Sequence, residues 1–506
     1  MTDLIISPTW NAPGETLRHT WEGVLNVDQF RWLVRKDCQD HLRMAHAEIG
    51  GRIVRAVGML CDEMRVVGRN PNLARQEGQE GTRTNFQIID YVIDELLALG
   101  IRPMITTCFI PAVLSGGSAT VFDTKSITSM PKDFAAWGRL IGELVQHLVD
   151  RYGRAEVRNW YFEVWNEPNL KGSFWDRDTD NEFDGLYGTL WTTTWRAIKK
   201  VDEGFRVGGP SAARGEWLQG LLEFSRREKC EPDYIISHVY NNDSDPKNSK
   251  YSPFIGSQAD RAPDSPNYTR GVVRGARKIL DDWGFKGEVH WNEWGTSWFP
   301  SQPLREMPQE AAWLCRTMGE VGQLGTYFGY WALSDIYNQV GYGRETFHHN
   351  YGMLNLQGLR KPAWFAHMLL SKLGDKRLPA TVANGSEDLG TIVSSSPSGR
   401  QALVFASQYN DASTRTNHRV RIKLPSRPAK GLRLWRLNED ENNILALWRG
   451  MGSPAYLNAD ERGYLQSQNK LTACYPKEVV VEEDAAGCWA SFDLPAPGVA
   501  LLEIPE

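Results

Sequence analysis

The sequence predicts an α/β fold in which a (β/α)8 barrel is followed by a C-terminal antiparallel β-sandwich. Strand-like apolar runs alternate with helix-like segments between about residues 40 and 375, which indicates a parallel sheet with crossover helices. Candidate functional residues recur at one end of many strands, which favours a closed barrel over an open sheet. After about residue 375, short β-prone runs are separated by Ser, Gly, Asn and Pro, a sequence pattern typical of an antiparallel β-sandwich.

The expected elements follow one another in regular order. Helical periodicity predicts helices at residues 37–50, 86–99, 132–152, 186–201, 217–229, 269–283, 310–322 and 362–373. Strands are predicted at residues 52–57, 102–109, 160–165, 205–209, 234–240, 289–294 and 327–332. Gly100 and Gly153 stand where helices are expected to end, a position that glycine favours. Seven to eight strand–helix units fit an eight-stranded barrel.

The chain of 506 residues exceeds one ordinary domain. We expect the catalytic barrel to occupy residues 18–374 and the sandwich to occupy residues 375–506. Residues 1–17 are a candidate for an additional strand of the sandwich. Within the sandwich, β-prone runs fall at residues 390–393, 402–406, 419–422 and 499–504.

Composition excludes several classes of partner. The net charge of −5 and the isoelectric point of about 6.1 argue against nucleic acid or an anionic membrane as a partner. No apolar run approaches the roughly 18 residues of a membrane span, and the first residues lack the features of an export signal. The seven cysteines are scattered without C-x-x-C spacing, which predicts reduced thiols in a cytoplasmic protein.

Two carboxylates stand at the ends of predicted strands. The run Trp-Tyr-Phe-Glu-Val-Trp-Asn-Glu at residues 160–167 is stopped by Pro168, which favours an extended exit for the preceding residues. The later run at residues 289–294 carries Glu293 near its end. A single Glu is usually a solvated surface charge, but both of these lie among Trp, Phe and Val, where an unpaired charge is costly. The pair predicts glycosidic bond cleavage, with one proton donor and one nucleophile or base.

The residues around the first carboxylate resemble a known family. Trp-Asn-Glu-Pro-Asn-Leu at residues 165–170, followed by Phe174 and Trp175, resembles the acid/base strand of clan A glycoside hydrolases. Within that clan the chain is most similar to glycoside hydrolase family 39, whose best-known members are β-xylosidases and α-L-iduronidases. The resemblance extends from about Asp40 to Gly374 and includes residues 330–336 and 351–356.

The resemblance implies a role for several residues. Glu167 would be the acid/base and Glu293 the nucleophile of a retaining double displacement. Residues implied to contact the sugar are Asn166, at the 2-hydroxyl, His238, Tyr240, Trp331, Trp298, Phe109, Phe174 and Trp175. Arg55 is equally compatible with sugar contact and with an ion pair beneath the site. We expect no cofactor and no metal, because no ligand cluster with metal-like spacing occurs.

Three positions depart from the pattern of the β-xylosidases. Val57 and Cys61 occupy places where those enzymes have His, and Trp298 stands where a Tyr is usual. Cys61 and Cys108 follow apolar runs, so packing is a better interpretation than cleft lining for both. A pocket that hydrogen-bonds a hydroxyl discriminates sharply, so missing polar groups imply a different sugar.

The sequence therefore predicts a retaining exo-glycosidase that acts on short hemicellulose-derived oligosaccharides, with a β-xylosidase as the default. An α-L-arabinosidase or another side-chain-directed glycosidase is the main alternative, and an endo-acting polysaccharide hydrolase is a further one. The loops at residues 241–267 and 338–350 are expected to decide between exo and endo action. A non-catalytic sugar-binding protein is disfavoured because both carboxylates are present. The predicted partner is an oligosaccharide or glycoside substrate, and the oligomeric state stays open.

Overall fold

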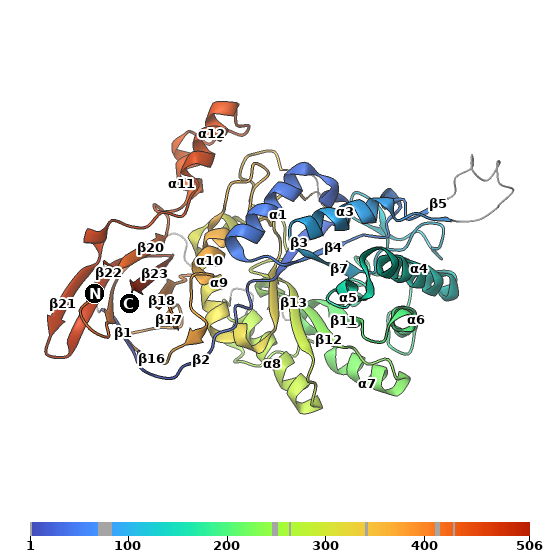
Figure 1. Ribbon diagram of the computed structural model, residues 1–506, viewed down its shortest axis with the longest axis horizontal. Coiled ribbons are helices and arrows are strands. Elements are labelled where there is room, and N and C mark those ends of the chain that lie inside the picture. The colour runs from blue at the N-terminus through green and yellow to red at the C-terminus, as the bar shows by residue number, and fades with distance from the viewer. Residues whose placement is uncertain are drawn as a thin grey trace.

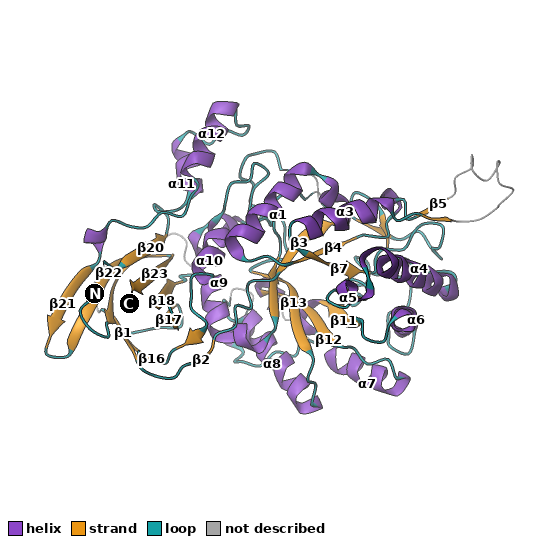
Figure 2. Cartoon of the chain, viewed as in Figure 1, coloured by secondary structure: helices purple, strands orange, loops and turns teal. Residues whose placement is uncertain are grey.

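The computed structural model describes residues 3–68, 83–244, 251–262, 265–337, 339, 343–409, 415–428 and 431–505. A barrel of strands surrounded by helices lies beside a second part built from antiparallel strands, and both ends of the chain lie in that second part (Figure 1). Helices flank the central strands of the first part and are scarce in the second (Figure 2). This arrangement confirms the predicted fold class.

Eight parallel strands form the barrel in the spatial order β14-β13-β12-β11-β10-β7-β4-β3. Their bounds are β3 Val24–Gln29, β4 Ile53–Val57, β7 Arg102–Thr106, β10 Tyr161–Glu163, β11 Arg206–Ala212, β12 Tyr234–Tyr240, β13 Glu288–Gly295 and β14 Tyr327–Tyr330. The surrounding helices are α1 Lys36–Ile49, α3 Gln87–Ala98, α4 Phe134–Tyr152, α5 Arg154–Val157, α6 Leu186–Val201, α7 Leu218–Glu228, α8 Tyr268–Trp283, α9 Pro308–Val321 and α10 Pro362–Leu370. Gly100 and Gly153 have φ angles of 78° and 84°, as helix-ending glycines do.

The first strand of the barrel, β3, was not predicted. Its sequence Val-Leu-Asn-Val-Asp-Gln mixes polar residues into a short apolar run, so neither an alternating nor a continuous apolar pattern is visible. The predicted strand that contains Arg55 is therefore the second strand of the barrel, β4. Arg55 is central to β4, which places its side chain inside the barrel.

Asn26 of β3 joins the two ends of the strand order. Its side-chain Nδ2 donates to the carbonyl oxygen of Gly329 at 2.9 Å and to that of Asn292. The backbone N–H of Leu333 donates to the carbonyl of Asn26 at 2.9 Å. A buried amide thus satisfies backbone groups where β3 meets β13 and β14. Asn26 interrupts the apolar pattern of β3, which prevented its prediction, and the same side chain closes the barrel.

Two antiparallel sheets make up the second part, with strand orders β16-β1-β19-β22-β21 and β2-β15-β17-β18-β23-β20. Their bounds are β1 Leu4–Pro8, β2 Glu15–Thr16, β15 Lys376–Arg377, β16 Ala380–Ala383, β17 Leu389–Ser396, β18 Gly399–Ala406, β19 Thr416–Lys423, β20 Arg433–Leu437, β21 Val480–Asp484, β22 Gly487–Ala496 and β23 Gly498–Pro505. β1 pairs antiparallel with β16 on one side and parallel with β19 on the other. The segment before the barrel thus supplies one strand to each sheet.

Two helices interrupt the sandwich, where the sequence led us to expect only β structure. They are α11 (Ile444–Gly450) and α12 (Ala459–Gln468), and they project away from the sheets in Figure 1. Asn458 and Glu461 form a reciprocal cap at the start of α12, a local signal that favours helix. The helices pack against Phe347 and Leu359, which belong to the segment after β14.

The sandwich has a hydrophobic core of its own between its sheets, and a further set of its apolar residues packs against the barrel. Helix α9 contacts β17, β18 and β23, and buried side chains of both parts, including Trp313 and Phe405, belong to a single cluster. Two pairs of two-residue antiparallel strands lie in the segments that follow the barrel strands β4 and β7. They are β5 (Val67–Gly68) with β6 (Arg83–Thr84) and β8 (Thr120–Val121) with β9 (Ser126–Ile127). Within the described residues, no helix has the length and apolar character needed to cross a membrane.

Candidate active site

A cavity of about 420 Å³ opens at the carboxyl ends of the barrel strands. The residues predicted to act on substrate that line it are Asn166, Glu167, Phe174, Tyr240, Glu293, Trp298 and Trp331. This is the face on which (β/α)8 enzymes carry their active sites. The strands β10, β12, β13 and β14 therefore bring together residues that are far apart in the sequence.

The chain leaves β10 through a tight turn, not through the extended exit that Pro168 led us to expect. Trp165 and Glu167 have φ angles of 66° and 47°, both in the left-handed region. The backbone N–H of Glu167 donates to the carbonyl of Ser211 at 2.8 Å, and Leu170 N–H donates back to the Glu167 carbonyl at 3.0 Å. A left-handed residue costs about 1–2 kcal/mol, and these hydrogen bonds to the neighbouring β11 segment and within the turn offset it. The turn leaves the Glu167 carboxyl in the cavity.

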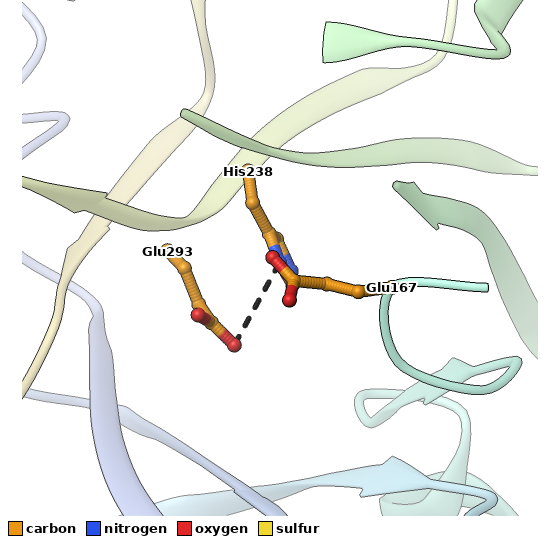
Figure 3. Close-up of side chains that lie close together, drawn as sticks. All are labelled: Glu167, His238 and Glu293. Carbon is orange, nitrogen blue, oxygen red and sulfur yellow. Dashed lines mark hydrogen bonds and ion pairs between the residues drawn. The ribbon is translucent and has the colours of Figure 1, made fainter. Parts of the chain in front are cut away.

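His238 lies between the two predicted catalytic carboxyls. Its Nδ1 is 3.0 Å from Oε1 of Glu167 and 3.7 Å from Oε1 of Glu293. Figure 3 shows the three side chains converging from three separate segments. One ligand atom from each residue lies within 4.8 Å of the other two. The two carboxyls are therefore close enough to act on one bond, and His238, which contacts both, is fully buried.

The surroundings of Glu293 favour its ionised form. Tyr240 donates its hydroxyl to Oε2 at 2.8 Å, and Arg55 donates Nη1–H to Oε1 at 2.7 Å. Burial alone would raise the pKa of Glu293, but the electrostatic effects of the nearby His238 and Arg55, together with these hydrogen bonds, lower it below its usual value. Glu293 is thus a carboxylate near neutral pH.

The surroundings of Glu167 have the opposite effect. Burial, aided by the negative charge of Glu293, raises the pKa of Glu167 above its usual value, although the hydrogen bond with His238 and the charge of Arg55 oppose the shift. Glu167 therefore holds its proton to a higher pH than an exposed glutamate. Two carboxyls in one cavity, with pKa values displaced in opposite directions, form an acid and a base.

Arg55 forms an ion pair beneath the cavity. Its guanidinium is fully buried and pairs bidentately with Glu163, with Nε–Oε2 and Nη2–Oε1 distances of 2.7 and 2.9 Å. Nη2 also donates to Oδ1 of Asn166 at 2.6 Å. Of the two interpretations left open by the sequence, the structure therefore places Arg55 in the ion pair. Its contacts orient Glu293 and Asn166 from below.

Two of the predicted aromatic walls lie behind the surface of the cavity. Phe109 and Trp175 are fully buried. Phe109 stacks on Phe174 with ring centroids 6.3 Å apart and meets Trp165 edge-on at 5.4 Å. Trp175 donates its indole N–H to the carbonyl of Asp180 at 3.0 Å. Both residues lie on the apolar side of the loop, so they support Phe174 and Trp165 without facing the cavity.

The three positions that depart from the β-xylosidase pattern have different surroundings. Val57 lines the cavity and presents an apolar side chain. Trp298 also lines it and is 45% exposed, at the rim. Cys61 is buried, with Sγ 3.3 Å from the hydroxyl of Ser126. The interpretation of Cys61 and Cys108 as packed thiols agrees with the burial of both.

Sequence reasoning missed several polar residues of the site. Glu163 could have been found, because it and Arg55 are opposite charges in otherwise apolar strands and each needs a partner. Gln339 lines the cavity, accepts from the Tyr337 hydroxyl at 2.9 Å and donates to Asp28. Burial raises the pKa of Asp28 to about 7. Asp28, Tyr337 and Gln339 carry no local signal, because they meet only where β3 lies beside the segment after β14.

Among the described residues, two groups of side chains bring possible ligand atoms close enough together to hold a metal ion. One is Glu167, His238 and Glu293, and the other is Glu441, Cys474 and Glu478 in the sandwich. In the first group a cation would compete with Arg55 for Glu293. In the second, Arg436 already pairs with both glutamates. Both groups of acidic residues thus have a cationic partner within the protein.

We expect Arg55→Met to destabilise the protein strongly. The substitution leaves Glu163 buried without its partner, which costs about 3–5 kcal/mol in the free energy of unfolding. Urea denaturation followed by fluorescence measures the change. Arg102→Met is the matched control, because Arg102 forms a half-exposed ion pair with Glu156, and such surface pairs contribute about 0–1 kcal/mol. A loss for Arg55→Met as small as that of the control would contradict the assigned importance of the buried pair.

Comparison with known proteins agrees with the geometry. The family model described as glycosyl hydrolases family 39 matches residues 6–482. A β-xylosidase from Caldicellulosiruptor saccharolyticus is 32% identical over 433 residues, which cover 85% of this chain and 84% of that protein. A β-xylosidase from Geobacillus stearothermophilus is 29% identical over 446 residues, covering 87% of this chain and 84% of that protein.

A solved structure extends the match to the whole fold. The GH39 enzyme from Xanthomonas axonopodis pv. citri is 26% identical in sequence, covers 100% of this chain and 98% of its own, and superposes with a TM-score of 0.82. The resemblance first seen around residues 165–170 is thus confirmed over most of the chain. The protein belongs to glycosyl hydrolases family 39 and is a glycoside hydrolase.

Proposed function

We propose that the protein is a retaining exo-β-xylosidase that releases xylose from short oligosaccharides by double displacement. One observation carries the proposal. Glu167 and Glu293 present carboxyl oxygens within 4.8 Å of each other, and retaining glycosidases have carboxyls about 5–5.5 Å apart, whereas inverting ones need about 6.5–9.5 Å. The opposite displacement of the two pKa values supports it. The β-xylosidases among the relatives support the choice of sugar.

In the first step, the Glu293 carboxylate attacks the anomeric carbon and forms a glycosyl ester. The bond between that carbon and the leaving oxygen breaks, and its electron pair stays on the oxygen. Glu167 gives that oxygen its proton, so the leaving group departs as a neutral alcohol. Burial keeps Glu167 protonated for this role, and Arg55 with Tyr240 keeps Glu293 ionised.

In the second step, Glu167 acts as a base. Esterification removes the negative charge of Glu293, which had raised the pKa of Glu167. The pKa of Glu167 therefore falls, and its carboxylate takes a proton from water as that water attacks the anomeric carbon. The ester bond breaks, Glu293 recovers its carboxylate and Glu167 its proton. Two inversions at the same carbon give net retention.

The remaining residues hold the sugar. Asn166 is anchored through Oδ1 by Arg55, which leaves its amide N–H groups for the 2-hydroxyl, a contact that strengthens in the transition state. Trp331 supplies an aromatic face at the floor of the cavity. The loops at residues 241–267 and 338–350, expected to separate exo from endo action, lie partly outside the described residues. For the compartment, a cytoplasmic location stays the expectation from the sequence.

A second activity, on α-L-arabinosides, is favoured by one observation. Val57 lines the cavity where the β-xylosidase pattern has a polar His, so one hydroxyl of the sugar loses a hydrogen-bonding partner there. Trp298 at the rim adds apolar surface at the position of a Tyr. Pockets of this kind relax the recognition of a single hydroxyl. The cavity could then accept a pentose of different configuration.

We expect a bell-shaped dependence of kcat/KM on pH. Activity should rise as Glu293 ionises, below the usual pKa of a glutamate, and should fall as Glu167 loses its proton, above that usual value. In Glu167→Gln the alkaline limb should disappear. Glu143→Gln, on the exposed face of α4, is the control and should keep both limbs. An unchanged alkaline limb in Glu167→Gln would assign the acid role to another group.

We expect Glu293→Ala to abolish turnover of aryl β-xylosides, because no group remains to form the glycosyl ester. Added azide should enter the vacated space and yield the α-xylosyl azide, which mass spectrometry and NMR identify. Wild-type enzyme should release β-xylose first, as followed by NMR before mutarotation. Substantial hydrolysis by verified Glu293→Ala, or α-xylose as the first product, would exclude the double displacement through Glu293.

A panel of aryl glycosides tests the sugar. We expect the β-xyloside to have the highest kcat/KM among the β-xyloside, α-L-arabinofuranoside, α-L-arabinopyranoside, β-glucoside, β-galactoside and α-L-iduronide. Val57→His should raise the preference for the β-xyloside by restoring a polar contact, typically by about tenfold or more when a site hydroxyl contact is regained. A higher kcat/KM of the wild type for an arabinoside would contradict the β-xylosidase activity and support the second activity, on α-L-arabinosides.

A further inference from the structure

The cavity has two sides, which the order of the barrel strands separates. Glu293 lies on β13, and beyond it β14, β3 and β4 lead to Trp331 and Val57. Glu167 follows β10, and the adjacent β11 leads directly into the 3-10 turn Ala213–Gly215, which carries Arg214. Arg214 lines the cavity on that side. The nucleophile side and the acid side of the cavity are therefore built from different strands.

The proposed mechanism places the sugar that forms the ester on one side of the cavity and the leaving group on the other. Glu167 protonates the leaving oxygen, so the leaving group must lie next to Glu167. The sugar that forms the ester must lie next to Glu293. The part of the cavity beside Arg214 is therefore the place for the leaving sugar, the +1 subsite.

Arg214 is held in position by a chain of hydrogen bonds that begins beside Glu167. Its Nε donates to Oε1 of Glu216 at 2.8 Å, and the other oxygen of Glu216 accepts from Nδ2 of Asn169 at 2.8 Å. Asn169 also accepts from the backbone N–H of Ala213 at 3.0 Å. Asn169 lies two residues after Glu167, so one network fixes both the acid and the arginine. An arginine pre-organised in this way loses little entropy when it binds a ligand.

The terminal nitrogens of Arg214 are available to a ligand. The side chain is 16% exposed, and within the described residues Nη1 and Nη2 have no hydrogen-bond acceptor. Burial lowers the pKa of Arg214, but Glu216, Asp243 and Glu167 raise it above its usual value, so the guanidinium is charged. A charged guanidinium whose terminal nitrogens face a cavity can donate to acceptors such as sugar hydroxyls.

The charge around Arg214 indicates a neutral ligand. Glu216 already pairs with the guanidinium, and Asp243 lines the same wall of the cavity. A carboxylate-bearing sugar would bring a further negative charge to a place where the positive charge of Arg214 is already paired with Glu216. A hydroxyl brings no charge and can accept from Nη1 or Nη2. The surroundings therefore favour a neutral pentose or hexose over a uronic acid.

We propose that Arg214 binds the hydroxyls of a neutral leaving sugar in the +1 subsite and makes the enzyme selective for oligosaccharides over simple glycosides. The inference rests on the proposed retaining mechanism, because that mechanism places the leaving group beside Glu167. Arg214 acts on binding and positioning of the leaving sugar and takes no part in proton transfer.

Two substrates with alkoxide leaving groups test this role. Xylobiose carries a sugar in the +1 subsite and methyl β-xyloside does not, and both need the proton from Glu167. We expect Arg214→Met to lower the ratio of their kcat/KM values (xylobiose over methyl β-xyloside) by about ten- to a hundredfold, the range for lost charge-assisted hydrogen bonds. Arg214→Lys should recover part of the ratio, because it restores the charge without the second donor.

Arg139→Met, an exposed arginine on α4, is the matched control and should keep the wild-type ratio. A structural or electrostatic role of Arg214 would slow both substrates by the same factor or shift the alkaline limb for both. Either result, or an unchanged ratio in Arg214→Met, overturns the inference while the proposed function stands. If the wild type cleaves neither xylobiose nor methyl β-xyloside, the proposed function itself is overturned.

Discussion

The buried guanidinium of Arg55 is the interaction on which the site depends. It joins β4 to Glu163 on β10, to Asn166 just beyond β10 and to Glu293 on β13. Four groups from three segments are thus fixed relative to one another inside the barrel. Buried ion pairs are poor sources of stability, because desolvation of the charges offsets their attraction. We therefore interpret the cluster as a device that orients Glu293 and keeps it ionised, with the apolar core of the barrel supplying the stability.

The same constraint explains how the pKa values of two identical side chains shift in opposite directions. Glu293 faces Arg55 and the Tyr240 hydroxyl, which stabilise its charge. Glu167 is equally buried but has His238 as its near partner and a negative charge beside it. The difference in pKa follows from which partners each carboxyl meets, since burial acts on both in the same direction. An acid and a nucleophile can then work together near neutral pH.

Selectivity is distributed over the rim of the barrel. Val57 and Trp331 follow strands on the side of Glu293, whereas Phe174 and Arg214 follow strands on the side of Glu167. On the proposed mechanism, we expect substitutions on the first side to alter which sugar is hydrolysed, and substitutions on the second to alter which leaving group is accepted. The loops can therefore diverge while the chemistry stays constant, as is usual for (β/α)8 enzymes. The helices α11 and α12 pack against the segment after β14 and thereby connect the sandwich to this rim.

The sequence by itself determined the fold class, seven of the barrel strands, the family and the two carboxyls, because apolar periodicity and the strand-end motif are local signals. It could not predict β3, whose Asn26 closes the barrel through contacts with distant strands. It also misplaced the exit of Glu167, since a hydrogen bond to Ser211 outweighs the local preference before Pro168. Only the tertiary structure separated Trp298 and Trp331 at the cavity from Phe109 and Trp175 behind it. Which side of a loop faces a cavity depends on the packing of residues far apart in the chain, and no local pattern records it.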